Sequence, residues 1–578
     1  MPPREKIPDT TFLSVSKISG LPSFCLFSLP QIWSQSKTRL HASMSTTVTL
    51  EETSLSSSKG APPQTVALKS LPVDNTLGSE EQLFRDVSEN QPAQWKFAVI
   101  LTLVSLMYMI STVLSGILAV GLPKIAKSID LDEGLLLWPA SVYSLSCGCT
   151  LLLSGSLADV VGCRRIYLLG SFLSTCLILA CGLARDGMEL IIFRALQGVA
   201  VSLCLPGSVS IVTNTFPLGR MRNIAFACLG AAQPTGFLIG LIIGGILIDS
   251  VGWRTAMYLI AGINAGVFVV SCFFLPSTAD DQLRYSILRR FREDVDWIGV
   301  SLISVAFGLL SYVLSAICAR PSSISTAANI VLLVVSLVLI PAFLIWEHYQ
   351  EKFNRPTLIP NSIWRNPIFT STCIMVFFAW ATVTTNQYFL ALFFEEVQGL
   401  SAFQTSLRFL PLVVSGVLAN IATGALVRHV RADILIGVSV LLSAATPLIL
   451  ALVAVNHSQL PYWAAAFPAA ILSPIWADVT LTIANLVITQ LFPRSLHGLA
   501  GGVSNTCAQL GTSIGLNLTA ILANAVTMSS TENKSSPVAL AEGYSAAFWA
   551  SFGATVAMIL VAVLGMRTAG KVGRPKHD

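Results

Sequence analysis

Residues 155–165 read G-S-L-A-D-V-V-G-C-R-R, a short polar stretch between two long apolar runs. Gly155 and Gly162 permit a tight backbone turn, Asp159 supplies an acid, and Arg164 and Arg165 supply paired positive charge. Each flanking run is long enough to cross a bilayer, for which a helix needs about 20 apolar residues. The stretch therefore indicates a charged turn between two membrane spans.

The composition of the whole chain agrees with this interpretation. Its 578 residues are 53% hydrophobic and 11% charged, with a mean hydropathy of +0.71, whereas soluble domains carry about 25% charged residues. In hydrocarbon every backbone polar group must be paired within the protein, which leaves helices or closed barrels. The long apolar runs lack the alternation of a barrel, so we predict an all-α polytopic membrane protein.

Charge and cysteine usage exclude several other classes. The net charge of +5 is modest and gives no sign of nucleic-acid binding. The twelve cysteines are scattered, mostly inside apolar runs, without the spacing of a metal site or a disulfide framework. We therefore expect free thiols and no bound metal.

Fourteen candidate membrane spans follow Trp95. Residues 1–94, rich in Ser, Thr and Pro, are expected to form a disordered cytosolic tail, and residues 567–578 a second cytosolic tail. The predicted spans are 97–121, 135–157, 166–184, 190–213, 224–248, 255–275, 297–317, 327–346, 369–394, 405–427, 434–455, 463–489, 498–525 and 545–566.

The loops differ in charge from one side of the membrane to the other. Loops that follow even-numbered spans hold fourteen lysines and arginines, against six in the opposite loops. The positive-inside rule therefore places the N-terminus in the cytosol. The N-x-S sequons at Asn456 and Asn533 fall in loops predicted to be external and are candidate glycosylation sites. A third sequon, at Asn517, lies within span 13 and should be out of reach.

Residues 424–431 read G-A-L-V-R-H-V-R and form a degenerate copy of the stretch at 155–165. Aligning the two makes span 9 the counterpart of span 1 and leaves spans 7 and 8 as an insertion. Such half-repeats are the expected plan of many transporters. We therefore predict two six-helix halves, at 95–276 and 369–566, joined by a linker at 277–368 with two extra helices.

The stretch at 155–165 resembles the loop signature of the major facilitator superfamily, G-x-L-A-D-R-x-G-R-R, with Val160 and Cys163 in place of two basic residues. In its predicted number of spans, with the extra pair in the middle, the chain resembles the fourteen-span drug:proton antiporter family. This resemblance implies the major facilitator fold. It also implies a conformational latch on the cytosolic side, which closes when the carrier faces outward, made of Gly155, Asp159, Gly162, Arg164 and Arg165. The alternative is plain positive-inside topology with a surface ion pair, worth about 0–1 kcal/mol.

Span 4 begins L-I-I-F-R-A-L-Q-G at Leu190, which resembles the family pattern L-x-x-x-R-x-x-Q-G. The pattern places Arg194 about one turn into the membrane. The resemblance implies a role for Arg194 in proton coupling. The alternative is an interface anchor whose charged head snorkels to water.

Span 5 carries glycines every four residues, at Gly236, Gly240 and Gly244, followed by Gly245. Glycines at this spacing line one helix face and admit a close neighbour. The family's antiporter signature ends in G-P-x-x-G-G, which this span resembles with Leu241 at the proline position. The glycines predict tight packing of span 5 against a neighbouring helix. The resemblance to the antiporter signature implies antiport.

The chain lacks the acid that the fourteen-span family often carries in span 1, since Leu114 occupies its position and Ala119 that of an asparagine. The alternative acid is Asp478, about halfway along span 12. A charge at that depth costs about 2.5–3.5 kcal/mol and should face the bundle interior or water. We interpret Asp478 either as the proton carrier or as a partner in a helix–helix hydrogen bond. A mid-span acid here resembles the aminotriazole-resistance-like subgroup of the family.

Other polar side chains within the spans are candidates to line a substrate cavity, or alternatively to bond a neighbouring helix. Glu395 and Glu396, at the external rim of span 9, are expected to be solvated. The cavity candidates are Gln197, Gln233, Asn386, Gln387, Asn485 and Asn505.

No enzyme motif is visible, and a P-loop and zinc-ligand spacings are missing from the sequence. We therefore expect a non-enzymatic protein without a cofactor. The predicted function is secondary transport that exports small organic compounds, such as drugs, toxins or secondary metabolites, by proton antiport. The alternatives are import of a small nutrient and a transporter-like solute receptor. The expected partners are the substrate, protons and the bilayer of the plasma membrane, or alternatively the vacuolar membrane, with the monomer as the functional unit.

Overall fold

The computed structural model describes residues 94–132, 135–216, 220–276, 295–319, 321–353, 355–427, 429–455, 462–492, 497–530 and 536–566. Regular secondary structure in these ranges is helical throughout. The predicted tails, apart from residue 94, and the sequons at Asn456 and Asn533 lie outside the described residues.

Among the described residues, fourteen helical segments are long and apolar enough to cross a membrane, which confirms the predicted count. The first six are α3 (Gln94–Ser128), α4 (Trp138–Val161), α5 (Cys163–Leu183), α6 (Gly187–Thr215), α7 (Arg220–Ser250) and α8 (Trp253–Phe274). The inserted pair is α10 (Trp297–Ala319) and α11 (Ala327–Lys352). The last six spans are formed by α12 (Pro367–Leu392) with η5 (Phe393–Val397), α13 (Ala402–Leu426), α14 (Ala432–Val455), α15 (Ala466–Leu472) with α16 (Ile475–Leu491), α17 (His497–Ser529) and α18 (Pro537–Gly565).

Local sequence signals set several helix ends. Asn366 accepts hydrogen bonds from the backbone N–H groups of Ile368 and Phe369 and is followed by a proline at the first helical position. Both features favour the start of a helix there. Gly162 has φ = +108° and separates α4 from α5. Because side chains rarely tolerate this conformation, a glycine is required at the turn.

The pattern of helix contacts repeats along the chain. In the first half (α3–α8), span 1 packs on span 5, span 2 on span 4, and span 3 on span 6. In the second half (α12–α18), span 9 packs on span 13, span 10 on span 12, and span 11 on span 14. Every pair in the second set lies eight spans after its counterpart, as the alignment of the two polar turns predicts. Between the halves, α4 contacts α17 and α7 contacts α13.

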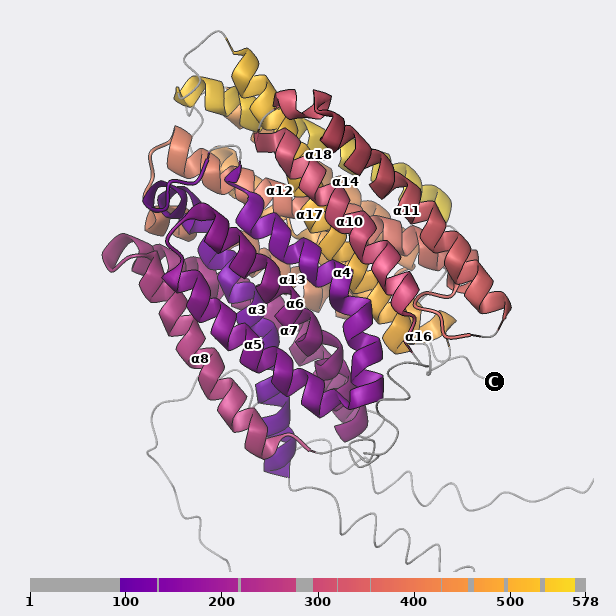
Figure 1. Ribbon diagram of the computed structural model, residues 1–578. Helices are drawn as coiled ribbons and strands as arrows, with labels where there is room; N and C mark the ends of the chain where they lie inside the picture. The colour runs from indigo at the N-terminus through magenta and orange to yellow at the C-terminus, as the bar shows by residue number, and fades with distance from the viewer. Residues whose placement is uncertain are drawn as a thin grey trace, which may run out of the picture. The chain divides into compact units, whose positions relative to one another are not determined.

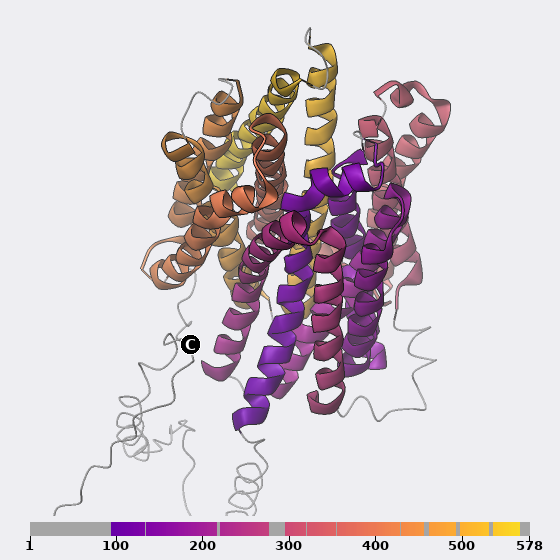
Figure 2. The same ribbon diagram turned by 90° about the vertical axis from the view of Figure 1, so that its left-hand side faces the viewer.

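The inserted helices α10 and α11 pack on each other at one side of the bundle (Figure 1). Figure 2 shows the pink pair from a second direction, again beside the other helices rather than between them. Of the two, α10 contacts α4 of the first half and α17 of the second. The insertion therefore lies against the seam between the halves.

Candidate functional site

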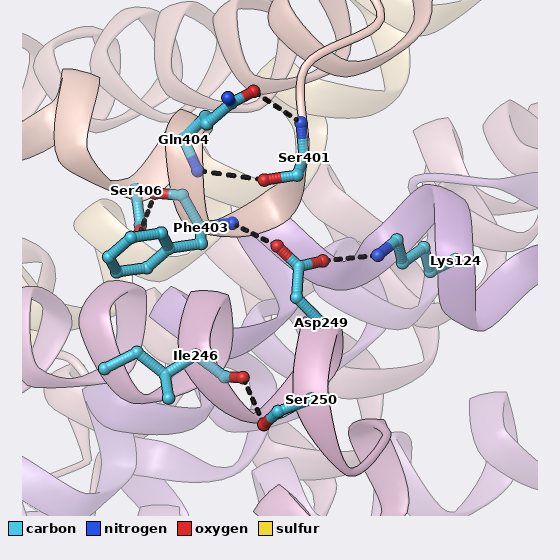
Figure 3. Close-up of polar contacts among 8 residues, drawn as sticks. All are labelled: Lys124, Ile246, Asp249, Ser250, Ser401, Phe403, Gln404 and Ser406. Carbon is cyan, nitrogen blue, oxygen red and sulfur yellow. Dashed lines mark hydrogen bonds and ion pairs between the residues drawn. The ribbon is translucent and has the colours of Figure 1, made fainter.

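The two halves are tied together at one end of the bundle. We call it the outer end, because it is where α3 and α7 finish and is the side predicted to be external. Asp249, at the end of α7, accepts a hydrogen bond from the backbone N–H of Phe403 on α13 (2.9 Å) and forms an ion pair with Lys124 of α3 (Figure 3). One carboxylate therefore links three helices from both halves.

The first turn of α13 is fixed by a capping box that precedes its contact with Asp249. Ser401 and Gln404 form a reciprocal capping box, with each side chain accepting from the other's backbone N–H at 3.2 Å (Figure 3). The N–H of Phe403 is one of the first-turn donors that have no partner inside the helix. Asp249 satisfies it and also places negative charge at the positive end of the helix dipole.

The predicted glycines of α7 lie where helices approach closely. A Cβ at Gly240 would collide with the backbone of Val113 on α3, and one at Gly244 would lie 2.9 Å from the Cα of Ile117. Gly236 faces α3 in the same way. Gly245 instead faces α13, where a Cβ would lie 3.0 Å from the carbonyl oxygen of Ala402. The glycines thus serve two different contacts.

The stretch at 155–165 lies at the opposite end and makes contacts within its own half. Arg164 donates to the carbonyl oxygen of Cys272 on α8 (2.7 Å), and Arg165 donates to that of Val161 (3.4 Å). Asp159 belongs to α4, but its side chain lies outside the described part of the structure. Among the described side chains, a Cβ at Gly155 would touch Pro206 of α6 alone, at 3.9 Å.

Arg194 is buried rather than snorkelling to the interface, with 1% of its surface exposed. Its Nε donates to the carbonyl oxygen of Pro139 on α4 (3.1 Å), and Nη1 donates to Oε1 of Gln197 (2.8 Å). The guanidinium lies 4.4 Å from the ring centroid of Tyr143, a cation–π distance. The phenol of Tyr388, on α12 of the other half, lies within its electrostatic range. The Arg194 side chain is therefore enclosed within the helix bundle.

This network leaves two buried donors unused. Nη2 of Arg194 and Nε2 of Gln197 have no hydrogen-bond partner among the described residues. Leaving a buried polar group unsatisfied costs about 1–3 kcal/mol, and more for a charged one. Both donors therefore remain unsatisfied inside the bundle in this conformation.

Asp478 lies in the first turn of α16, beside a break in span 12. Its carboxyl group contacts the side chain of Asn420 on α13, and Thr482 donates to the Asn420 carbonyl oxygen (3.2 Å). A Cβ at Gly416 of α13 would lie 2.9 Å from Oδ2 of Asp478. The acid thus lies in a small polar cluster between two helices of the second half, and glycine leaves it room.

The helix break beside Asp478 has its own support from α14. The Ser443 hydroxyl donates to the carbonyl oxygen of Leu472 (2.8 Å) and accepts from the backbone N–H of Trp476 (3.0 Å). These two backbone groups flank Pro474, which begins the second segment. Because backbone groups in a membrane must be paired, Ser443 allows the chain to interrupt its helix next to an acid.

Asn386 and Gln387 lie beside a gap between the helices of the second half that is too small to hold a water molecule, together with Ser473 at the same break. Oδ1 of Asn386 and Oγ of Ser473 are buried without a hydrogen-bond partner among the described residues. Ser473 lies five residues before Asp478. One of these unsatisfied polar atoms therefore belongs to the helix break that precedes Asp478.

The remaining candidates are more dispersed. Asn505 is exposed and donates to the carbonyl oxygen of Gly501 on its own helix (3.3 Å). Asn485 is exposed, on the same face of α16 as Asp478, and Gln233 is half-buried on α7. No group of three or more His, Cys, Asp or Glu side chains in the described ranges is placed to hold a metal ion.

The expectation that Glu395 and Glu396 are solvated is wrong. Both are half-buried in the π-helical turn η5, Glu396 accepts a hydrogen bond from the Tyr544 hydroxyl, and Oε1 of Glu395 is buried. Lys124 and Asp249 of the other half contribute to the electrostatic field at Glu395. The turn folds inward at the outer end, against the closure between the halves.

Sequence reasoning missed Arg408 and the role of Asp249. Arg408 lies on α13, with its guanidinium 5.1 Å from the ring centroids of both Phe394 and Tyr462. An arginine inside a predicted span was a visible signal for this site. The pairing of Asp249 with Phe403 had no local signal, because it joins residues 154 positions apart.

The repeated halves, the polar groups between helices and the closure at one end define a multi-span membrane transporter. The family model described as "Major Facilitator Superfamily" matches residues 104–516, and the chain belongs to this family. A protein of Pyricularia oryzae named "MFS-type transporter 1" is 41% identical over 510 residues, covering 80% of this chain and 82% of that protein.

More distant relatives carry different names. A Saccharomyces cerevisiae protein named "Low affinity ammonium transporter" is 26% identical, covering 67% of this chain and 73% of its own. Another from that yeast, named "Aminotriazole resistance protein", is 24% identical and covers 66% and 69%. Among solved structures, a bacterial homologue of the human lysosomal transporter Spinster, in an inward-facing and unoccupied conformation, superposes with a TM-score of 0.57 at 15% identity. It covers 82% of this chain and 98% of that protein. These similarities support the major facilitator fold.

Proposed function

We propose that this protein is a secondary active transporter that exports small organic compounds in exchange for protons. The observation that carries the proposal is Asp478, an acid about halfway along span 12, held by Asn420 and next to a helix break. A carboxyl group at membrane depth is by default a functional candidate, and proton relays are a common use. The relative named for aminotriazole resistance supports export and membership of the fourteen-span drug:proton antiporter group.

In the proposed cycle, the state in which Asp249 joins the halves at the outer end is the one that faces the cytosol. Substrate binds from that side, and Asp478 releases its proton to the cytosol. The halves then move about the substrate, breaking the contacts of Asp249 at the outer end. Substrate leaves and Asp478 takes up a proton from outside. The stretch at 155–165 acts as the latch on the cytosolic side in the outward-facing state.

Arg194 has a positioning role in this proposal. Its fixed positive charge lies in the first half, near Tyr388 of the second, so it acts on the field between the halves. Leu114, at the usual position of the span 1 acid, is buried with 1% exposed. The proposed coupling therefore depends on the second half rather than on span 1.

The test uses the full-length protein in proteoliposomes with an imposed pH gradient and an internal pH-sensitive dye. Radiolabelled aminotriazole serves as the first probe, followed by a panel of apolar toxins. We expect gradient-driven substrate movement with proton counterflow in the wild type, and loss of proton counterflow in Asp478→Asn. Asp433→Asn, which alters a partly exposed acid paired with Arg431, is the matched control. Unchanged proton counterflow in Asp478→Asn contradicts the role of Asp478.

A second candidate function is uptake of a small cation. The yeast relative named for ammonium transport and the missing span 1 acid favour it. Radiolabelled methylammonium in the same vesicles distinguishes the two functions. Uptake down the methylammonium gradient, independent of the pH gradient and unaffected by Asp478→Asn, supports the second function and excludes proton antiport of this probe.

A further inference from the structure

Two buried carboxyl groups meet where α10 begins and α11 ends, on the side predicted to be cytosolic. Asp296 directly precedes α10 and is 7% exposed, and Glu347, in the last two turns of α11, is fully buried. Asp296 accepts hydrogen bonds from the backbone N–H of Gly299 (2.9 Å) and from the indole N–H of Trp346 (3.0 Å). A Cβ at Gly299 would collide with oxygens of both carboxyl groups, which also lie within hydrogen-bonding reach of each other. Glycine therefore leaves the space in which the two acids meet.

Glu347 also holds the segment that follows α11. Its carboxyl oxygens accept hydrogen bonds from the backbone N–H groups of Leu358 (3.2 Å) and Ile359 (3.4 Å). We call residues 355–366, which lead from α11 to α12, the strap. Because a buried backbone N–H needs a partner, Glu347 allows this part of the strap to be buried.

The strap is docked on a hydrophobic cluster that contains residues of both halves. The side chains of Leu358 and Ile359 are 4% and 8% exposed and belong to this cluster. All of its members named here lie toward the predicted cytosolic ends of their helices. From α4 of the first half the cluster includes Leu152, and from α12, α16 and α17 of the second half it includes Phe369, Ile488 and Val503. The acid pair therefore holds a segment that packs at the cytosolic end of the seam between the halves.

The surrounding charges do not neutralise the acid pair. Among the described residues, neither carboxyl group has a Lys, Arg or His side chain as an ion-pair partner, and the charge that acts on Glu347 is that of Asp296. The elements packed on α11 are α10, η3 (Pro321–Ser325) and η4 (Asn361–Arg365). The other titratable side chains near α11 are half-buried or exposed, or lie toward the opposite end of α10: His348, Tyr349, Glu351, Lys352, Arg355, Arg365, Tyr312 and Cys318.

The position of the two acids requires a proton between them. Two negative charges in this space would repel each other, and each would be buried without a cation. One shared proton lowers both costs, because the protonated carboxyl group donates its O–H to the other. The remaining negative charge then lies among the N–H donors of Gly299, Trp346 and the strap. Two acids that occupy one site share a proton for this reason.

We propose that Asp296 and Glu347 form a pH-sensitive clasp, which docks the strap while the two acids share one proton and releases it once that proton passes to cytosolic water. Loss of the proton leaves two facing carboxylates, which separate. The N–H groups of Leu358 and Ile359 then lose their acceptor, and the strap leaves the cluster. The clasp lies in the inserted helices, apart from Asp478. It makes the packing at the cytosolic end of the seam depend on cytosolic pH, whichever compound the protein carries.

The test is hydrogen–deuterium exchange, read by peptide mass spectrometry, on the full-length protein in lipid nanodiscs from mildly acidic to mildly alkaline pH. Exchange in a peptide that contains the strap is corrected for its intrinsic rate with an unfolded peptide of the same sequence. Because release frees one proton, protection of Leu358 and Ile359 should fall by up to about tenfold for each pH unit. A peptide from α5, a helix without an acidic residue, should keep its protection and reports any general loss of structure.

Glu347→Gln keeps an acceptor oxygen for the strap and cannot ionise, so protection of the strap in this variant should not vary with pH. Glu347→Ala removes the acceptor and should leave the strap unprotected at every pH. Glu351→Gln, which alters a half-buried acid one turn further along α11, is the matched control and should follow the wild type. Protection of the wild-type strap that does not change with pH, or an equal pH dependence in Glu347→Gln, overturns the proposal.

Discussion

Asp249 on α7 accepts a hydrogen bond from the backbone N–H of Phe403 on α13 at 2.9 Å, and this contact joins the two halves at the outer end. The contact is exposed to solvent, and charged contacts at an exposed surface contribute about 0–1 kcal/mol. We therefore expect Asp249→Ala to shift the carrier toward an outward-open state by up to about fivefold. The measurement is labelling of a cysteine introduced at Ser406, buried beside Gly245, by a membrane-impermeant thiol reagent.

The control for this first prediction is Glu542→Ala, which removes an exposed acid near the outer end of α18. Equal labelling rates in Asp249→Ala and Glu542→Ala would show that the contact does not hold the outer end closed.

Gly240→Ala should destabilise the protein, because its Cβ would collide with the backbone of Val113. Overpacking in a tightly packed interior typically costs about 1–3 kcal/mol. The apparent melting temperature in detergent, followed by size-exclusion chromatography after heating, should fall by several degrees. Gly230→Ala on the same helix is the control, since a Cβ there meets no atom within 4 Å. A fall of equal size in both variants would contradict the close approach of α3 and α7.

Gly416→Ala should disturb proton coupling without changing any titratable residue. The new Cβ would lie 2.9 Å from Oδ2 of Asp478, which must then move from its place beside Asn420. We expect the ratio of protons to substrate in vesicle transport to fall, while substrate binding is retained. Gly424→Ala, on the same helix with open space at its Cβ, should keep the wild-type ratio. An unchanged ratio of protons to substrate in Gly416→Ala would contradict a role of Asp478 in proton coupling.

Arg194→Lys keeps the charge but removes the forked geometry that reaches both Pro139 and Gln197. Because lysine is a point charge with a different arrangement of donors, we expect transport to fall by about tenfold or more, in line with a lost buried charged hydrogen bond of about 1.5–3 kcal/mol. Arg254→Lys, at a guanidinium that stacks on Trp253, is the control for loss of arginine stacking. If Arg194→Lys transports at the wild-type rate, transport requires only the positive charge at this position and not the geometry of the guanidinium group.

The sequons provide a test of the predicted sidedness. Asn517 is buried within α17, with 3% exposed, so a glycosyltransferase cannot reach it. We expect a glycosidase-sensitive mobility shift that disappears in the double variant Asn456→Gln, Asn533→Gln and persists in Asn517→Gln. Loss of the shift in Asn517→Gln alone, or its persistence in the double variant, would contradict the predicted orientation.

The number of spans could be predicted because span length is a local property. A run of about 20 apolar residues must be helical in a membrane whatever surrounds it. The repeat at 424–431 was also visible as a pattern, and the matching helix contacts of the two halves agree with it. Close packing at Gly240 was predictable for the same reason, since glycines four residues apart share one helix face.

The partners of the polar side chains were decided by tertiary structure. Sequence left Arg194 between an interface anchor and a coupling residue, and only the packing of α4 on α6 buries it against Pro139. The sequence predicted that Glu396 is solvated, but the π-helical turn η5 directs its side chain toward the Tyr544 hydroxyl. Asp249 meets Phe403 through the approach of α7 to α13. Helix rotation and the packing of helices bring together residues 55 to 154 positions apart, so no local pattern of residues encodes these contacts.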